Sequence, residues 1–279
     1  MVVFLNGQFV PEAQAVVPVN DRGFLYGDGL FETVRVFNGR PFRLAQHLER
    51  LVRGADYLKI KLPFTPKALH QFAEALIGKN EMPDAVLRVT LSRGSGERGY
   101  TPKPGGTPTV VMTLHPAPLI DAARPTQWSM ITSSHRVSAG DVLSSFKTTS
   151  KLLHVMARIE AEARGVDEAL ILNTNGEVAE AASANLFWVY HDKICTVPAE
   201  RDVLPGITRA VVLEICQMLG FQTEKRVIKP EALHHGEGVF LSQSALGVIG
   251  ITGLDGEPFR QSPLLEKIHQ TYCAMLAGE

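Results

Sequence analysis

Two stretches of the chain repeat apolar residues at helical spacing. The repeats run through residues 44–58 and 152–163, where apolar side chains stand three or four positions apart. The positions are Leu44, Leu48, Leu51, Ala55 and Leu58 in the first stretch, and Leu152, Met156, Ile159 and Ala163 in the second. Because this spacing gathers apolar side chains on one face, each stretch predicts an amphipathic helix. Gly165 is expected to end the second helix.

Three more helices are expected at capping signals. Thr65-Pro66 predicts a helix that ends near Gly78, residues 204–209 open one that ends at Gly220, and the last begins at Ser262.

Strands are predicted where apolar and β-branched residues run together between turn signals. Asn-Gly or Asp-Gly pairs mark tight hairpins at residues 6–7, 38–39 and 255–256. The expected strands cover residues 2–5, 8–10, 30–37, 85–92, 107–114, 128–133, 168–172 and 239–242. Helices and strands are mixed without strict alternation, which predicts an α+β fold.

A proline-rich stretch divides the chain. Residues 115–126 contain three prolines and show no periodic pattern, so we expect an interdomain linker there. The 279 residues are enough for two ordinary domains. The sequence therefore predicts a smaller N-terminal α/β domain over residues 1–114 and a larger C-terminal α/β domain over residues 127–279.

Charge and cysteine content argue against several classes of protein. The formal net charge is −1 and the charges are interspersed, so we expect no nucleic-acid partner and no membrane surface. Cys195, Cys216 and Cys273 form no CxxC pair, which argues against a disulfide framework or a metal site and suits a reducing cytosol. There is no secretion-signal pattern, and no apolar run approaches the ~18 residues of a membrane helix. We therefore expect a cytoplasmic globular protein.

Lys147 is the first candidate for a chemical role. It lies among small hydroxylic residues and Phe146, close to the expected start of the second helix. A helix start and an apolar setting both disfavour a positive charge, so both lower the pKa of a lysine. A neutral, nucleophilic amine is what a Schiff-base lysine needs. Taken alone, however, a lysine is more often a solvated surface residue.

Four other features could bind an anion or a cationic ring nitrogen. The helix start at Gly206-Ile207-Thr208 offers free backbone N–H groups, and Ser242-Gln243-Ser244 offers hydroxyl groups after a strand. Arg50 could donate charge-assisted bonds to a phosphate. Glu180 stands in an otherwise apolar strand, where a carboxylate needs a partner such as a protonated pyridine nitrogen. Taken singly, each feature also fits an ordinary cap, loop or solvated charge.

In this order, the features resemble the class IV (fold-type IV) aminotransferase family of pyridoxal-phosphate enzymes. The resemblance covers residues 21 to about 255. The matching motifs are Asp-Arg-Gly-Phe-Leu-Tyr-Gly-Asp-Gly-Leu-Phe-Glu-Thr at 21–33, His47-x-x-Arg50-Leu51, Lys147 with its helix, Asp167-Glu168-Ala169-Leu170, Glu180 to Phe187, Leu204 to Arg209 and Ser242-Gln243-Ser244-Ala245. The family has a D-amino-acid aminotransferase-like fold, with a smaller N-terminal and a larger C-terminal α/β domain and the cofactor between them. Its members are usually homodimers.

The resemblance implies a role for each matched residue. Lys147 would bond the cofactor, pyridoxal 5′-phosphate, and would move protons of a small-molecule substrate. Glu180 would pair with the pyridine nitrogen of the cofactor. The residues implied to hold the phosphate are Arg50, Ile207, Thr208 and Ser244.

Within the family, the loop over residues 93–102 favours a lyase. Its Arg-Gly-Ser-Gly-Glu-Arg-Gly-Tyr run looks like that of 4-amino-4-deoxychorismate lyases, in which Arg98 and Tyr100 would bind a substrate carboxylate. D-amino-acid transaminases usually have a histidine at position 100 and a tyrosine where this chain has Phe31. Branched-chain transaminases have a tyrosine in place of Lys151, whose role here stays open.

The resemblance therefore implies conversion of 4-amino-4-deoxychorismate to 4-aminobenzoate and pyruvate, a reaction of folate biosynthesis. The alternative is a transaminase of D-amino acids or branched-chain amino acids, because the early chemical steps are shared. A third hypothesis is a cofactor-binding protein without turnover, which fold alone does not exclude. It is disfavoured because a mere binder needs neither Lys147 nor Glu180.

Overall fold

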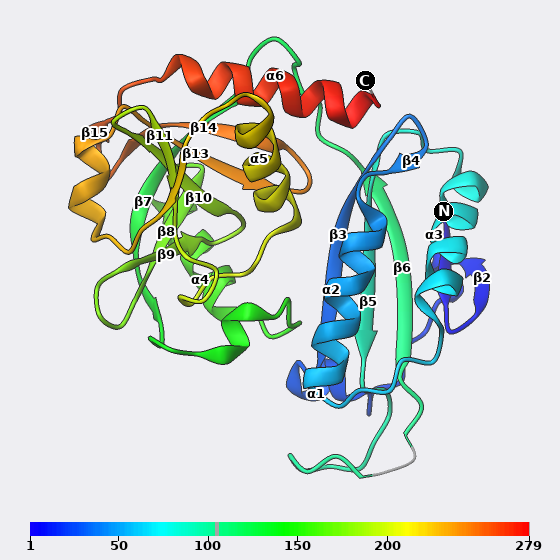
Figure 1. Ribbon diagram of the computed structural model, residues 1–279. Coiled ribbons are helices and arrows are strands. Elements are labelled where there is room, and N and C mark those ends of the chain that lie inside the picture. The colour runs from blue at the N-terminus through cyan, green and yellow to red at the C-terminus, as the bar shows by residue number, and fades with distance from the viewer. Residues whose placement is uncertain (104–105, 279) are drawn as a thin grey trace. The chain divides into compact units, whose positions relative to one another are not determined.

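The computed structural model describes residues 1–103 and 106–278, which form two compact units (Figure 1). Unit 1 consists of Met1–Ala117 and Phe146–Ser150, and unit 2 consists of Pro118–Ser145 and Lys151–Glu279. Each unit combines helices with a β-sheet, which confirms the α+β prediction.

Unit 1 is built on an antiparallel sheet, whose described strands follow the order β2-β1-β6-β5-β3-β4. They are β1 (Val2–Leu5), β2 (Gln8–Pro11), β3 (Gly29–Phe37), β4 (Arg40–Pro41), β5 (Ala85–Ser92) and β6 (Thr109–Pro116). The Asn6-Gly7 hairpin is confirmed, since β1 and β2 pair on either side of it. Asn6 and Gly7 have positive φ angles of 50° and 95°, as a type I′ turn requires. The hairpin at residues 38–39 joins β3 to β4 in the same way.

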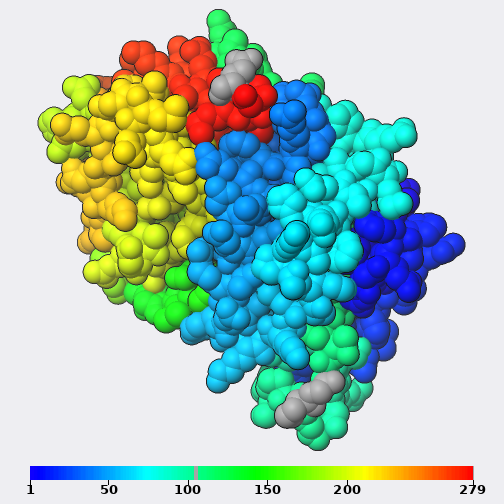
Figure 2. Space-filling model, turned by 45° about the vertical axis from the view of Figure 1, so that its right-hand side comes forward, coloured from blue at the N-terminus to red at the C-terminus, as the bar shows by residue number. Residues whose placement is uncertain are grey.

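Helices α2 (Leu44–Tyr57) and α3 (Pro66–Asn80) cover one face of this sheet (Figure 1). The apolar spacing of α2 is confirmed, because its apolar side chains are buried in the unit 1 core. Alternate residues of β5 complete that core, namely Ala85, Leu87, Val89 and Leu91. Figure 2 shows the surfaces of α2 and α3 side by side, in light blue and cyan. A short helix, α1 (Arg22–Tyr26), and a 3₁₀ turn, η1 (Glu12–Gln14), lie between β2 and β3 in the chain.

A segment from the middle of the chain adds to this sheet. Residues 146–150 pair with β3 on the edge that β5 leaves open. Phe31 N–H donates to Lys147 C=O, and Thr149 N–H donates to Gly29 C=O, both at 2.9 Å. These bonds make the segment part of unit 1.

Unit 2 contains a mixed sheet with the described strand order β12-β11-β10-β13-β14-β7-β8-β9, and β15 pairs with β14. Its strands are β7 (Thr126–Val137), β8 (Glu168–Asn173), β9 (Val178–Ala181), β10 (Asn185–Tyr190), β11 (Lys193–Thr196), β12 (Thr223–Lys225), β13 (Gly238–Gln243), β14 (Gly247–Leu254) and β15 (Glu257–Pro258). Its helices are η2 (Val142–Ser145), α4 (Leu152–Ala163), α5 (Ile207–Met218), η3 (Pro230–His235) and α6 (Pro263–Ala277). Strand β7 runs parallel to both of its neighbours, β14 and β8. Among the described helices of the chain, none is long and apolar enough to cross a membrane.

Helix α4 forms where the sequence predicts it, but it packs through different side chains. Ala157 and Ala161 are fully buried, on a helix that packs against β7 and β8. The predicted apolar face, with Leu152, Met156 and Ile159, is exposed instead. Small alanines let the helix approach the sheet closely, which leaves the larger apolar side chains outside. The helix is therefore where the pattern predicts it, but its larger apolar residues do not pack on the sheet of unit 2.

The connection between β6 and β7 has neither helix nor strand over residues 117–125. Of the predicted linker, His115 and Pro116 belong to β6, and Thr126 is the first residue of β7. The segment 146–150 lies within the predicted C-terminal domain, although its contacts assign it to unit 1. The division into two domains over residues 1–114 and 127–279 stays a prediction.

Candidate active site

Lys147 lies at the edge of the unit 1 sheet. Its carbonyl group accepts a hydrogen bond from Phe31 N–H, and the next residue, Thr148, forms a β-bridge with Leu30. Helix α4 begins only at Leu152. The prediction that a helix dipole acts on Lys147 is therefore wrong. Pairing with β3 holds this residue, a contact between segments that are far apart in the sequence.

Two cationic side chains approach the ring of Phe31. Lys147 Nζ lies 4.6 Å from the ring centroid, and Arg88 Cζ lies 3.9 Å from it. Both distances are within the range in which an aromatic face attracts a cation. Phe31 thus brings both cationic groups to one aromatic ring.

Arg88 is a candidate site residue that sequence reasoning missed. It projects from β5 on the face opposite the apolar core, and its Nε donates to Thr90 Oγ1 at 3.2 Å. Burial lowers the pKa of its guanidinium from the usual value, since a desolvated charge is unfavourable. Among the described residues, no acid forms a salt bridge with it. A half-buried arginine without an acidic neighbour suits an anionic ligand. The sequence feature that could have identified Arg88 is its place in a predicted strand whose alternate residues are apolar.

Arg50 is buried between α2 and β3, where it binds Glu32. Its Nε and Nη2 donate to the two carboxylate oxygens at 2.8 and 2.7 Å, and His47 Nδ1 lies 2.7 Å from Oε2. Burial alone would raise the pKa of Glu32, but the bonds from Arg50 and His47 outweigh it and lower this pKa to about 2. Burial lowers the pKa of His47, and the charges of Arg50 and Lys147 lower it further. The contact with Glu32 raises this pKa but does not outweigh them. The sequence motifs contain all three residues, but they do not reveal that Glu32 contacts the other two.

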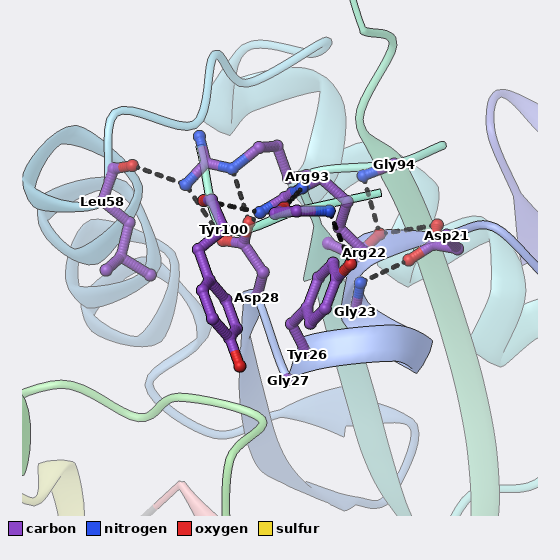
Figure 3. A network of polar contacts seen from close by, with 12 residues as sticks. Asp21, Arg22, Gly23, Tyr26, Gly27, Asp28, Leu58, Arg93, Gly94 and Tyr100 are labelled. Carbon is purple, nitrogen blue, oxygen red and sulfur yellow. Dashed lines mark hydrogen bonds and ion pairs between the residues drawn. The ribbon is translucent and has the colours of Figure 1, made fainter. Parts of the chain in front are cut away.

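Two arginines tie the 93–100 loop to the rest of unit 1 (Figure 3). Arg22 Nε and Arg93 Nε both donate to Asp28 Oδ2, at 2.9 and 2.7 Å. Arg93 also donates to the carbonyl group of Leu58 at 2.8 Å. The first arginine of the loop motif therefore has a structural contact with Asp28 and with the end of α2.

Arg98 and Tyr100 project from the same loop. Both are exposed, and Arg98 makes no hydrogen bond or ion pair with residues 1–103 or 106–278. Glu97, its neighbour in the chain, pairs with Lys103 instead. The ring of Tyr100 makes an edge-on contact with Tyr26, with 5.7 Å between the centroids. The guanidinium of Arg98 is thus open to an anion from solution.

Glu180 projects from β9 in unit 2 and is half-buried. Its Oε2 accepts hydrogen bonds from Asn185 Nδ2 and from Leu204 N–H, both at 3.1 Å. Its Oε1 lies 3.8 Å from His154 Nε2. His154, on α4, is a second residue that sequence reasoning missed, and its buried Nδ1 has no hydrogen-bond partner among the described residues. Glu180 is therefore fixed through one oxygen, while the other faces an imidazole.

The start of α5 offers groups that fit a phosphate. Gly206 is the N-cap residue and makes no side-chain cap, so the first-turn N–H groups can bind an anion. Thr208 is buried in that first turn. Ser242 Oγ is buried and has no hydrogen-bond partner within the described residues, which is uncommon for a buried hydroxyl. Ser244 follows in the turn after β13. Unpartnered hydroxyl and amide donors are the chemistry that a phosphate group requires.

The predicted site residues divide between the two units. Unit 1 carries Phe31, Arg50, Arg98, Tyr100 and Lys147. Unit 2 carries Glu180, Ile207, Thr208 and Ser244.

Over most of its length the chain is similar to several known enzymes. The relatives include a putative branched-chain-amino-acid aminotransferase from Methanocaldococcus jannaschii, which is 34% identical over 92% of this chain and 88% of its own length. The solved branched-chain aminotransferase of Escherichia coli matches with a TM-score of 0.94 and 26% identity, covering 100% of this chain and 95% of that one. A putative 4-amino-4-deoxychorismate lyase from Legionella pneumophila matches with a TM-score of 0.87 and 26% identity, covering 96% of each chain.

The family model of class IV aminotransferases matches residues 29–254. That range contains Lys147, Glu180, Thr208 and the 93–100 loop. Enzymes of this family depend on pyridoxal 5′-phosphate, which is therefore the cofactor of this chain. The protein belongs to the class IV aminotransferases, the fold-type IV enzymes of pyridoxal phosphate.

Proposed function

We propose that this protein is a lyase that converts 4-amino-4-deoxychorismate to 4-aminobenzoate and pyruvate. The observation that carries the proposal is the 93–100 loop. Its backbone is bound to the unit that holds Lys147, and its Arg98 projects without a partner among the described residues. A planar guanidinium in that state binds a carboxylate through two parallel hydrogen bonds.

A second cation supports the same substrate class. Arg88 lies on the Phe31 ring that also receives Lys147 Nζ. Phe31 has no hydroxyl group that could donate to a carboxylate, so the cationic groups are the donors on that side. A substrate with two carboxylates, such as 4-amino-4-deoxychorismate, has a partner for both Arg88 and Arg98.

The residues have separate roles in the reaction. When bound, the cofactor supplies an electron sink for the pair left behind by a removed proton. Lys147 would hold the cofactor at rest, and its Nζ, free once the substrate amine has taken its place, would accept the proton from the substrate carbon that bears the amino group. Glu180 holds a proton on the pyridine nitrogen, and Asn185 with the Leu204 N–H keeps that carboxylate in place. The electron pair left by that proton would expel the enolpyruvyl group by breaking its C–O bond to the ring. The departing enolate would gain a proton at its methylene carbon to become pyruvate, and the ring would become aromatic.

The phosphate group would be bound by polar donors and one cation. We assign Thr208, the backbone at Ile207 and Ser244 to the phosphate oxygens, with Arg50 as the cationic partner. The buried, unpartnered Ser242 Oγ supports an anion beside the first turn of α5. Glu32 orients Arg50, since both carboxylate oxygens accept from its guanidinium.

The alternative is a transaminase of branched-chain or D-amino acids. The Methanocaldococcus jannaschii relative favours it, being named as a branched-chain-amino-acid aminotransferase at 34% identity. In that case Lys147 would return the proton to the cofactor. The cofactor-binding residues serve both reactions, so only the groups that contact the substrate distinguish them.

We further propose that the protein works as a cytoplasmic homodimer on a small-molecule substrate. Exposed apolar side chains on α4 support a second copy, because isolated apolar surface of this kind is usually covered in an assembly. The described cysteines are all free, which suits a reducing compartment.

The test compares two reactions of one preparation. Purified holoenzyme is given 4-amino-4-deoxychorismate while release of 4-aminobenzoate is followed, and separately amino-acid and keto-acid pairs. We expect the lyase rate to exceed every transamination rate. Lys147→Ala should abolish both reactions, and faster transamination by the wild-type enzyme would overturn the lyase proposal.

A further inference from the structure

We propose that Arg22 is a positioning residue that sets the substrate preference by fixing the backbone around Arg98. Together with Asp28 and Arg93 it forms a group that we call the loop clamp. The proposal rests on the proposed function, in which Arg98 receives a substrate carboxylate. Arg22 itself touches neither substrate nor cofactor in this account.

Arg22 binds the loop through its backbone. Its Nη1 donates to Gly99 C=O at 2.8 Å and to Glu97 C=O at 3.4 Å, and its Nη2 donates to Tyr100 C=O at 3.1 Å. The side chain is only 5% exposed, so these bonds form away from competing water. The carbonyl groups held in this way belong to the residues on both sides of Arg98.

Asp28 fixes the direction of the Arg22 guanidinium. It accepts from Arg22 Nε at 2.9 Å, which leaves both terminal nitrogens of the planar fork aimed at the loop (Figure 3). Arg93 binds the same carboxylate through Nε at 2.7 Å and Nη2 at 2.9 Å. Burial alone would raise the pKa of Asp28, but the two arginines outweigh it and lower this pKa, so the carboxylate stays charged.

Arg93 extends the clamp to the end of α2, where it donates to the carbonyl groups of Leu58 and Lys59 at 2.8 and 2.9 Å. The clamp thus ties the base of the loop to the end of a helix in the same unit.

Tyr26 supplies a further attachment. Its hydroxyl oxygen accepts from Gly99 N–H at 2.9 Å, and the Arg22 guanidinium lies 4.8 Å from its ring centroid. Gly99 has a φ of +112°, a conformation that side chains disfavour, so the backbone after Arg98 can turn only with glycine there. With its flanking peptides fixed, Arg98 is preorganised for a carboxylate before substrate arrives.

Limited trypsin digestion of the holoenzyme tests the clamp without any substrate. Trypsin cleaves after Arg98, and cleavage requires the loop to open locally. A hydrogen bond from a charged donor shifts such an equilibrium by roughly 10- to 100-fold. Arg22→Ala should therefore raise the rate of cleavage at Arg98–Gly99 at least ~10-fold, as followed by mass spectrometry. Glu97→Gln is the matched control, because it removes only an exposed ion pair of the same loop and should cleave at the wild-type rate.

Steady-state kinetics of the same variants test the effect on substrate. In Arg22→Ala we expect KM to rise at least ~10-fold, with kcat changed less and the affinity for pyridoxal phosphate unchanged. Arg22→Lys should behave like Arg22→Ala, because an ammonium group cannot reach Asp28 and three carbonyl groups together. A low, non-denaturing concentration of guanidinium ion can occupy the space left by the side chain in Arg22→Ala. It should restore resistance to trypsin and the wild-type KM in that variant but not in Arg22→Lys.

The outcomes separate the clamp from the proposed function. Wild-type cleavage and KM in Arg22→Ala would overturn the clamp. Faster cleavage with unchanged KM would remove the loop from the substrate site and contradict the proposed function as well as the specificity role of Arg22. If Arg22→Ala fails to fold, Tyr26→Phe removes one attachment more gently and should show a smaller change in the same direction. Wild-type behaviour of Tyr26→Phe would then count against the proposal.

Discussion

Lys147 and Lys151 are close together in the sequence, but their structural surroundings differ. Lys147 is paired with β3 and lies near the ring of Phe31. Lys151 occupies the N-cap position of α4 and belongs to the other unit. We assign the role of the nucleophilic amine to Lys147, because pairing with β3 fixes its backbone and its Nζ lies beside the Phe31 ring.

Borohydride reduction checks this assignment. The purified protein should be yellow, and reduction should fix the cofactor covalently to the peptide that contains Lys147. Lys147→Ala should remove the fixed label, whereas Lys151→Ala should retain it. A label on Lys151 in peptide mapping would contradict the assignment.

Glu180 is predicted to act on rate more than on cofactor binding. Replacement by Gln keeps the hydrogen bonds to Asn185 and to Leu204 N–H but removes the charge that keeps a proton on the pyridine nitrogen. Turnover should fall by about 100-fold or more, the size of effect seen when a preorganised electrostatic partner is lost. The cofactor content, measured by absorbance, should stay the same. Glu162→Gln on the exposed side of α4 serves as the control, and unchanged turnover in Glu180→Gln would make the residue structural.

Arg98 is predicted to require its planar fork. Arg98→Lys should reduce kcat/KM for the substrate nearly as much as Arg98→Ala, since lysine cannot form two parallel bonds to a carboxylate. Cofactor retention should not change in either variant. Arg124→Ala, at another exposed arginine, provides the comparison. If Arg98 only formed an exposed ion pair on the surface, that pair would contribute about 0–1 kcal/mol to stability, and its loss would leave the kinetics unchanged. Wild-type kinetics in Arg98→Ala would therefore exclude the loop from the site.

At the scale of elements, α2 and β3 are joined by a buried ionic cluster of Glu32, His47 and Arg50. The sequence spacing of α2 gives its apolar face and its length correctly, because those follow from a repeat within the helix itself. It does not reveal that Glu32 lies opposite Arg50, since that contact depends on how the helix docks on the sheet. The same reason explains α4, where large and small apolar residues share one periodicity and only packing decides which of them are buried.

The cluster predicts how the stability of the protein depends on pH. The pKa of His47 is lowered, so the unfolded chain binds a proton first and the free energy of unfolding should fall as pH drops below ~6.5. The pKa of Glu32 falls from 4.5 to about 2, so its contribution is present above pH 4.5 and is lost as pH falls towards 2. One pKa unit corresponds to about 1.36 kcal/mol, which makes the Glu32 contribution roughly 3 kcal/mol.

Urea unfolding between pH 7 and pH 3 measures this dependence. Glu32→Gln should be less stable at pH 7, because Arg50 and His47 lose their buried partner. Its stability should also fall less steeply than that of the wild type below pH 4.5. Glu74→Gln, which alters an exposed pair with His70 on α3, should follow the wild-type curve. Parallel curves for Glu32→Gln and the wild type would refute the assignment.

At the scale of the whole molecule, the α+β architecture was predictable from turn signals and periodicity. Asn6-Gly7 specifies a hairpin because both residues accept a positive φ, and this information is local. The loop clamp was not predictable, because Arg22 meets Gly99 and Tyr100 only after β3 and β5 have paired. The candidate site was therefore recognised from the order of its motifs, while the contacts that position it came from the structure.

The exposed face of α4 predicts a specific assembly. We expect sedimentation to give twice the mass of one chain, because Leu152, Val155, Met156 and Ile159 would otherwise remain in water. The double variant Met156→Glu/Ile159→Glu should shift the equilibrium towards single chains. A Glu162→Lys variant on the same helix, at an exposed charged position, is the control. A wild-type protein that sediments as single chains at micromolar concentration would disprove the dimer.

The segment 146–150 has a practical consequence for dividing the protein. The chain leaves unit 1 after Ala117, returns for five residues that include Lys147, and leaves again at Lys151. A fragment that stops at the linker would carry most of unit 1 but not the segment 146–150, whose Lys147 carbonyl accepts from Phe31 N–H. Expressed halves cut at residue 117 should therefore be inert apart, and the C-terminal half would have to add this segment to β3 to restore a working enzyme. A split reporter built on this fold should be cut elsewhere, in an exposed turn within one unit such as residues 255–256.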